Sequence, residues 1–413
     1  MLYFKHSELV TNYHVSLKTV HNWIDAAKQR KIELELHNKN GRMYVANNPK
    51  NIDVLKSLSE QGKKYRNVRY QKIIKPSKQF YDIYSNRQIL DIISNLNIHR
   101  EIPLKYNYLD DGATNWDNWV THLAEEDAPN MMHNTQELVA ESLDSIEGLL
   151  AGRKKVNIID LGVGNAMPVN TLIKHINERG LLNRYIGIDI SQSMLDIAER
   201  NLKNWFGEDF NYEGHVRDFS FERFDDLLVD DMIDNEDGSV LNLVLLFGST
   251  PLNFRNPNDG LRTVYGSMSE NDLLIFTCKP DTDNSRRFFG GTLDGNRQGL
   301  DPYVRYSLDL LNIDSSLYDV ETGFNEQTRM RFVRVRLKVA LTIEFEFKNN
   351  IHRVSIEKGD AILLLRVWHK TALETINDFE KIGFVLLRSN MTKDRERLLT
   401  ISGIDTKSDV GRS

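Results

Sequence analysis

From residue 156 onward, apolar runs alternate with amphipathic stretches. Short continuous apolar runs predict buried strands, and apolar residues spaced three and four apart predict helices. The predicted order is strand 156–161, helix 167–180, strand 184–190, helix 191–204, and strands 211–217, 241–247 and 272–279. A last group follows, with helix 372–381 and strands 384–389 and 397–402. This order predicts an α/β, Rossmann-like fold with a mostly parallel sheet and an antiparallel last strand.

The first 48 residues have a different pattern. Helices with serine caps are predicted at 7–13 and 16–28, and the second has an apolar face made by Leu17, Val20, Trp23, Ile24 and Ala27. Residues 32–36 alternate like a strand, 38–41 predict a tight turn, and 43–45 complete a hairpin. The short polar or cationic side chains suited to DNA phosphates and base edges are Lys18, Thr19, His21, Asn22 and Arg42.

This succession of helix, turn, helix and hairpin resembles the winged helix-turn-helix of the MerR and excisionase group. The resemblance covers residues 1–48 and implies DNA binding. Domains of that group usually work in pairs, which favours a homodimer. A protein–protein interaction or dimerisation domain of the same fold is the alternative.

Charge is divided unevenly along the chain. Residues 1–80 contain 16 Lys and Arg against 6 Asp and Glu, whereas the remainder contains 37 against 53. Such segregation favours a basic module, with DNA as a candidate partner through residues 1–80, joined to an acidic catalytic body. A solvated basic linker without a partner has the same composition.

The candidate cofactor site follows the strand at 156–161. A strand, a glycine turn, a helix and a second strand ending in an acid together form a unit that binds nucleosides by their ribose hydroxyls. The residues of this unit are Asp160, Gly162, Gly164 and Asp189, and the third strand adds Asp218 and Phe219 to meet an adenine ring. The set predicts S-adenosylmethionine (SAM) as the cofactor. A Rossmann dehydrogenase is the alternative, but the third glycine is missing and Asp218 would have no role.

Two further motifs carry a family resemblance. Phe247-Gly-Ser-Thr-Pro-Leu-Asn-Phe254 resembles the Leu-Gly-Ser-Thr-x-Gly-Asn-Phe signature of histidine-specific, ergothioneine-type methyltransferases, with Leu252 in place of a glycine. Tyr108-Leu-Asp-Asp-Gly-Ala-Thr-Asn-Trp116 is similar to the family's Tyr-Asp-x-x-Gly-Ser-x-Leu-Phe segment. The resemblance spans about residues 90–410. It implies a class I SAM methyltransferase in which Tyr108 and Asn253 hold the acceptor's amine or carboxylate, with Gly248 and Ser249 beside the cofactor.

One departure from the family bears on the acceptor. The family grips imidazole with a Glu and a Ser two positions later on the last accessory strand, whereas the matching stretch here is Asp360-Ala-Ile-Leu-Leu-Leu-Arg-Val-Trp-His-Lys370. Arg366 and Trp368 become the candidate substrate-binding residues. A cation and an aromatic ring favour an anionic or flat acceptor, so we expect an acceptor other than histidine.

These observations predict a domain division and a function. The predicted parts are a winged helix-turn-helix at 1–60, a basic linker at 61–89, an α+β accessory substrate domain at 90–135 and 281–365, and a SAM-binding core at 136–280 and 366–413. The predicted function is N-methylation of an amino acid or small amine. The alternative is a transcriptional regulator whose methyltransferase-like domain senses SAM or a metabolite. A nucleic-acid methyltransferase is disfavoured because no Asn/Asp-Pro-Pro-aromatic cluster follows the fourth strand.

Several classes of protein are excluded by composition. The single cysteine, Cys278, excludes an internal disulfide framework and a cysteine-cluster metal site. Histidines lack metal-ligand spacing, so no metal is expected. No apolar run reaches the roughly 18 residues that a membrane span needs, and no signal peptide is evident. A cytoplasmic enzyme is the expectation.

Overall fold

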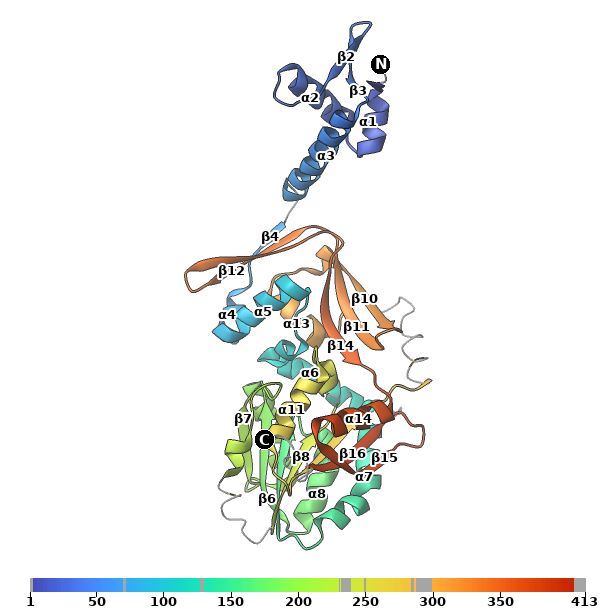
Figure 1. The fold of residues 1–413 in the computed structure, drawn as a ribbon. Coiled ribbons are helices and arrows are strands. Elements are labelled where there is room, and N and C mark those ends of the chain that lie inside the picture. The colour runs from blue at the N-terminus through green and yellow to red at the C-terminus, as the bar shows by residue number, and fades with distance from the viewer. Residues whose placement is uncertain are drawn as a thin grey trace, which may run out of the picture. The chain divides into compact units, whose positions relative to one another are not determined.

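The computed structural model describes residues 3–69, 72–126, 130–229, 231, 239–248, 250–283, 286 and 299–404, with the backbone alone for 61–69 (Figure 1). The chain divides into two compact units. Unit 1 is Met1–Ile73 with Val339–Thr342, and unit 2 is Ile74–Lys338 with Ile343–Ser413.

Unit 1 contains helices and a small antiparallel sheet of order β1-β3-β2. Its elements are β1 (Tyr3–Phe4), α1 (His6–Tyr13), α2 (Leu17–Lys28), β2 (Leu36–Lys39), β3 (Arg42–Ala46) and α3 (Pro49–Arg69), and β4 (Lys72–Ile74) follows. The Ser16 hydroxyl caps α2 by accepting from the Thr19 amide at 3.1 Å. Val20, Trp23 and Ile24 are buried, but Leu17, expected on the same face, is 50% exposed.

The predicted strand at 32–36 is wrong, because β2 begins only at Leu36. The Asn51 side chain explains the difference. Its Oδ1 accepts from the Glu35 amide at 3.0 Å, and its Nδ2 donates to the Glu35 carbonyl at 3.0 Å. The Glu35 carbonyl also accepts from the Ala46 amide of β3 at 2.9 Å, so the Asn51 side chain replaces a strand partner only at the Glu35 amide. The predicted hairpin is present, and its two-residue turn at Asn40 and Gly41 has positive φ at both positions.

Unit 2 is built on a seven-stranded sheet of order β15-β16-β9-β8-β5-β6-β7. The parallel strands are β5 (Lys155–Leu161), β6 (Leu182–Asp189), β7 (Tyr212–Val216), β8 (Val240–Leu246) and β9 (Leu273–Cys278). The hairpin of β15 (Phe384–Met391) and β16 (Leu398–Ile404) joins antiparallel to β9. This strand order confirms the predicted class I methyltransferase fold.

Alternate residues of these strands face two separate cores, as the two-residue period of a strand requires. On one face lie α7 (Met131–Leu150), α8 (Asn170–Glu178) and α9 (Gln192–Phe206), packed on Ile158 and Leu243. On the other face lie α11 (Pro257–Ser267) and α14 (Ala372–Ile382), packed on Ile159 and Val244. Both faces are covered, which explains why the strands read as continuous apolar runs.

The remaining elements of unit 2 precede the core or are inserted after β9. Those that precede it are α4 (Lys78–Ile83), α5 (Asn86–His99), α6 (Asp111–Glu125) and the 3₁₀ turn η1 (Leu104–Tyr108). The insertion contains α13 (Pro302–Leu310), β10 (Tyr318–Asn325), β11 (Met330–Leu337), β12 (Leu341–Phe347), β13 (Asn350–Ile356) and β14 (Ala361–Trp368). The first two residues of β12 belong to unit 1. Short 3₁₀ turns are η2 (Met167–Val169), η3 (Asp225–Leu228), η4 (Thr250–Asn253) and η5 (Ser315–Leu317). Strands β10, β11 and β14 form a meander-like antiparallel sheet.

The predicted domain boundaries stay predictions. Helix α3 runs across residue 60, and α5 begins at Asn86. Among the described residues, no helix is long and apolar enough to cross a membrane.

Candidate functional site

Three loops converge at the carboxyl edge of the large sheet. Gly162, with φ of +69°, lies directly after β5. A Cβ atom built on it would be 3.6 Å from the Phe219 ring and 3.7 Å from the Thr250 hydroxyl oxygen. The loops after β5, β7 and β8 therefore meet at this glycine. Open parallel sheets bind ligands at this edge.

Asp189 ends β6 beside the glycine loop. Its side chain accepts the backbone N–H of Ser191 at 3.0 Å, and the amides of Gly164 and Ile190 also donate to it. Burial raises the pKa of this carboxyl to about 6, although these amide donors act in the opposite direction. No cation pairs with it among the described residues, so its remaining acceptor capacity is available for hydroxyl donors.

Asp160, on β5, is buried behind the loop. The Tyr185 hydroxyl donates to its Oδ2 at 2.5 Å. Burial raises the pKa of Asp160 to about 7, while the Tyr185 hydrogen bond lowers it. Asp160 was predicted as part of the nucleoside-binding unit, and that role stays a prediction. Tyr185 was not recognised from the sequence, where it reads as one more apolar strand residue.

Asp218 and Phe219 follow β7. The Lys105 ammonium lies 2.7 Å from Asp218 Oδ2, and the Ser220 amide donates to Oδ1 at 3.1 Å. The Phe219 ring is buried, with its centroid 5.7 Å from that of Phe254. Lys105 comes from η1 and was not anticipated, although it lies three residues before the recognised Tyr108.

Helix α6 lies against the glycine loop. A Cβ atom at Gly164, which has φ of +56°, would be 2.7 Å from the Trp116 ring, so a larger residue would collide with it. The neighbouring Asp117 accepts from Asn165 Nδ2 at 2.8 Å. Trp116 belongs to the motif recognised in the sequence, but no role had been assigned to it.

Gly112 explains the start of the same helix. A Cβ atom there would be 2.1 Å from the Asn107 carbonyl oxygen. Only glycine allows η1 and α6 to approach this closely, which fixes Tyr108 at the end of η1.

Tyr108 and Asn253 are the predicted acceptor-holding residues. Tyr108 is half-buried against Met194 and Ile197, and its ring is 6.2 Å from that of Trp116. Burial raises its pKa well above the usual value, with Tyr303 and Asp189 adding to the effect. Asn253 is half-buried at the end of η4. Neither side chain makes a hydrogen bond within the described part of the chain, so both are available to a ligand.

Two more predicted cofactor residues follow β8. Gly248 has φ of +77°, and its amide donates to the Thr277 hydroxyl at 3.3 Å. Ser249 lies outside the described residues.

Strand β14 places Arg366 and Trp368 near the end of η4. Arg366 forms an ion pair with Glu101, and Arg255 forms a second ion pair with the same Glu101 oxygen. The Trp368 indole N–H donates to the Phe254 carbonyl at 2.8 Å, and its ring packs against the apolar core. Trp368 therefore acts here as a packing residue that ties η4 to β14. Glu101 and Arg255 had no signal in the sequence.

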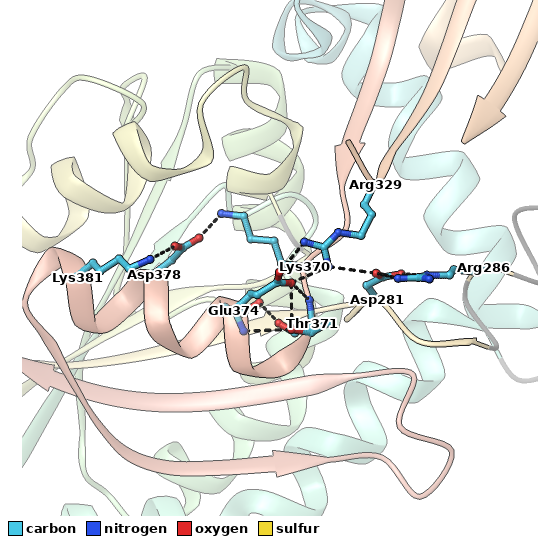
Figure 2. A network of polar contacts seen from close by, with 9 residues as sticks. Asp281, Arg286, Arg329, Lys370, Thr371, Glu374, Asp378 and Lys381 are labelled. Atoms are coloured by element: carbon cyan, nitrogen blue, oxygen red, sulfur yellow. Dashed lines mark hydrogen bonds and ion pairs between the residues drawn. The ribbon is translucent and has the colours of Figure 1, made fainter. Parts of the chain in front are cut away.

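A second charged cluster, the Arg329 network, lies between the β10–β11 turn and α14 (Figure 2). Arg329 donates to both Glu374 carboxylate oxygens at 2.7 and 2.6 Å and lies 3.4 Å from Asp281. Arg286 donates to both oxygens of Asp281, at 2.9 and 2.6 Å. Because Asp281 follows β9, the network ties the inserted strands to the core.

In unit 1, the predicted DNA-contacting residues are largely exposed. Lys18, His21, Asn22 and Arg42 are exposed, whereas Thr19 is half-buried and its hydroxyl lies 2.9 Å from that of Ser16. A cavity of about 770 Å³ lies between the helices and the hairpin. Its lining includes Lys5, His6, His21, Lys28, Arg42 and Tyr44.

Comparison with known protein families indicates which reaction the site catalyses. Residues 87–286 match the family described as histidine-specific, SAM-dependent methyltransferase. The protein is a SAM-dependent methyltransferase. The match includes Tyr108, the glycine loop, Asp189, Asp218 and the η4 turn. No curated protein matches this methyltransferase significantly.

Solved structures with similar folds share little sequence with the methyltransferase. A SAM-dependent methyltransferase from Clostridium acetobutylicum is 12% identical, with a TM-score of 0.39, and covers 70% of this chain and 98% of its own. The magnesium protoporphyrin IX methyltransferase of Synechocystis, with bound SAH, is 11% identical, with a TM-score of 0.38, and covers 72% and 96%. Because these TM-scores are low, the fold assignment rests on the strand order.

The residues present fit SAM. The methyltransferase combines a glycine loop with positive φ, a buried Asp189 that no cation of the described residues pairs with, and Phe219 beside Gly162. Within the described residues, no group of three or more His, Cys, Asp or Glu side chains is placed to hold a metal ion.

Proposed function

We propose that the methyltransferase methylates the amino group of an amino acid or small amine other than histidine. The observation that carries this proposal is the pair of unengaged polar side chains, Tyr108 and Asn253, at the same sheet edge as Asp189. The family resemblance gives these two positions to the acceptor. Two fixed polar groups can orient an amine and a carboxylate of one small molecule.

The chain's task in such a reaction is positioning. SAM, when bound, supplies the electrophilic methyl group on its sulfonium. Asp189 would accept from ribose hydroxyls, and Phe219 with Asp218 would flank the adenine. Tyr108 and Asn253 would hold a neutral amine in line, while Trp116 and the apolar residues around Tyr108 exclude water.

The departure at β14 argues against histidine as the acceptor. The family's carboxylate and hydroxyl for imidazole are replaced by Arg366 and Trp368. A guanidinium cannot accept a proton from imidazole and repels its charged form. We therefore place histidine low among candidate acceptors, although the family is described by it.

Calorimetric titration with SAM and with S-adenosylhomocysteine (SAH) tests the proposal, followed by a methyl-transfer screen of amino acids. We expect micromolar binding by the wild type and its loss in Asp189→Ala, because this carboxylate would lose its ribose hydroxyls. Asp209→Ala, which changes a carboxylate in the loop between α9 and β7, is the matched control. Absence of binding by the wild type, or an Asp189→Ala variant that binds normally, contradicts the assigned site.

A second candidate function concerns unit 1. We propose that it is a winged helix-turn-helix that binds DNA, which makes a regulator sensing SAM or a metabolite the alternative to an amino-acid enzyme. The exposed Lys18, His21 and Asn22 on α2, with Arg42 on the hairpin, support it. These groups suit phosphates and base edges.

Fluorescence anisotropy with duplex DNA at two salt concentrations tests this second proposal. Replacing both Lys18 and Arg42 by Ala should weaken binding by roughly tenfold and flatten its salt dependence, because two phosphate contacts are lost. Lys50→Ala, an exposed cation of unit 1 paired with Glu33, is the control. Equal DNA binding by all three proteins contradicts the contacts assigned to Lys18 and Arg42, and no DNA binding by the wild type argues for the protein–protein alternative.

A further inference from the structure

Arg255, Glu101 and Arg366 form a compact charged cluster, called here the Arg366 cluster. The Nη2 atoms of both arginines donate to the same Glu101 oxygen. The side chains of Arg366 and Glu101 are only 10% and 9% exposed, and that of Arg255 is 39% exposed. The three residues come from β14, from the segment after α5, and from the segment after η4.

The Arg366 cluster carries one unbalanced positive charge. Arginine stays protonated in proteins, so one carboxylate neutralises only one of the two guanidiniums. The Asn95 amide oxygen accepts from Arg255 at 3.0 Å but adds no charge. Burying an unbalanced charge is unfavourable, which points to an anion that the described part of the chain does not supply.

A specific donor is also left over. Arg366 Nε is buried and has no hydrogen-bond partner within the described part of the chain. A buried donor without a partner costs about 1–3 kcal/mol. Such groups are exceptional in folded proteins, and a missing ligand is one of the standard explanations.

The cluster stands beside the acceptor residues. Asn253 lies two residues before Arg255 in the chain, and the Trp368 N–H holds the intervening Phe254 carbonyl against β14. Arg366 and Trp368 lie two residues apart on one strand and therefore share a face. Strand β14 also contacts η1, which ends at Tyr108, so the cluster lies near both predicted acceptor residues.

We propose that the methyl acceptor is an acidic amino acid whose side-chain carboxylate binds Arg366 and Arg255, with Glu101 positioning both guanidiniums. This inference rests on the proposed N-methyltransferase function and names its substrate class. A carboxylate matches the planar donor fork of arginine. It also carries the single negative charge that neutralises the cluster, whereas a phosphate dianion would overcompensate it.

The test is calorimetric titration of the full chain, saturated with SAH, with L-aspartate, L-glutamate, their amides and L-histidine. We expect at least one acid to bind about tenfold or more tightly than its amide. Arg366→Gln and Arg255→Gln should each weaken binding of that acid by roughly ten- to a hundredfold and leave the amide unchanged, because each removes a charged donor. Arg329→Gln, from the charge-balanced Arg329 network, is the matched control and should not change acid binding.

The outcomes separate the two proposals. If SAH binds but no acid exceeds its amide, or no acid binds at all, the acidic acceptor is wrong and the methyltransferase assignment stands. If SAH itself does not bind, the assigned cofactor site is wrong, and the acid titrations do not bear on the acceptor. If Arg366→Gln does not fold, Arg255→Gln decides the question, because it is more exposed and leaves the Arg366–Glu101 pair intact.

Discussion

The Arg366 cluster and the Arg329 network are built from the same side chains and differ in charge balance. In the Arg329 network, two arginines meet two carboxylates, and each carboxylate is gripped through both oxygens (Figure 2). In the Arg366 cluster, two arginines share one oxygen of one carboxylate, and a buried Nε donor is left over. A charge-balanced cluster can stabilise the contact between two segments by itself, whereas an unbalanced cluster can bind a ligand of opposite charge.

The same contrast appears among the carboxylates. The Arg329 guanidinium lowers the pKa of Glu374 to about 2. Asp189 has no such partner in the part of the chain that the structure describes, and burial raises its pKa to about 6. A carboxylate paired within the chain is already satisfied in the folded protein. A carboxylate that is buried without a cation is stabilised when a ligand supplies hydrogen-bond donors, which agrees with the role proposed for Asp189.

The largest effect in the Arg329 network is expected for Arg329→Gln. The change removes both hydrogen bonds to Glu374 and the contact with Asp281, and should lower the free energy of unfolding by about 1–3 kcal/mol. Urea unfolding measures it. Arg305→Gln, which breaks an exposed pair with Asp309 on one helix, should change stability by at most about 0.5 kcal/mol. Equal losses of unfolding free energy in the two variants would mean that the Arg329 network stabilises the fold no more than an exposed ion pair does.

A smaller change in the free energy of unfolding is expected when the pH is lowered. The folded pKa of Glu374 lies below its usual value of 4.5. Its contribution to stability is therefore complete above about pH 4.5 and is lost as the pH falls toward about 2. The difference in unfolding free energy between wild type and Arg329→Gln should narrow over that window. A difference that stays constant with pH would mean that charge pairing contributes little.

The positions of the glycine loop and of Asp189 at strand ends could be predicted from sequence because they depend on local order, while their contacts with the cofactor stay a prediction. Gly162, Gly164 and Asp189 lie at the ends of consecutive strands, and parallel strands bring such ends together wherever the sheet forms. The hairpin turn at Asn40 and Gly41 was readable for a similar reason, since two residues with positive φ determine it. The error at residues 32–36 arose beside Asn51, which is distant in sequence and accepts the Glu35 amide in place of a strand partner.

Sequence alone determined the class of fold, the cofactor and the motif positions Tyr108 and Asn253. Only the tertiary structure joined Glu101 and Arg255 to Arg366, set Lys105 on Asp218, and assigned the Trp368 N–H to the Phe254 carbonyl. The physical reason is the separation along the chain of the residues that interact. Strand period, glycine turns and helix caps act over a few residues, whereas an ion pair depends on segments that meet only after the chain has folded. The acidic acceptor that we propose depends on the second kind of contact.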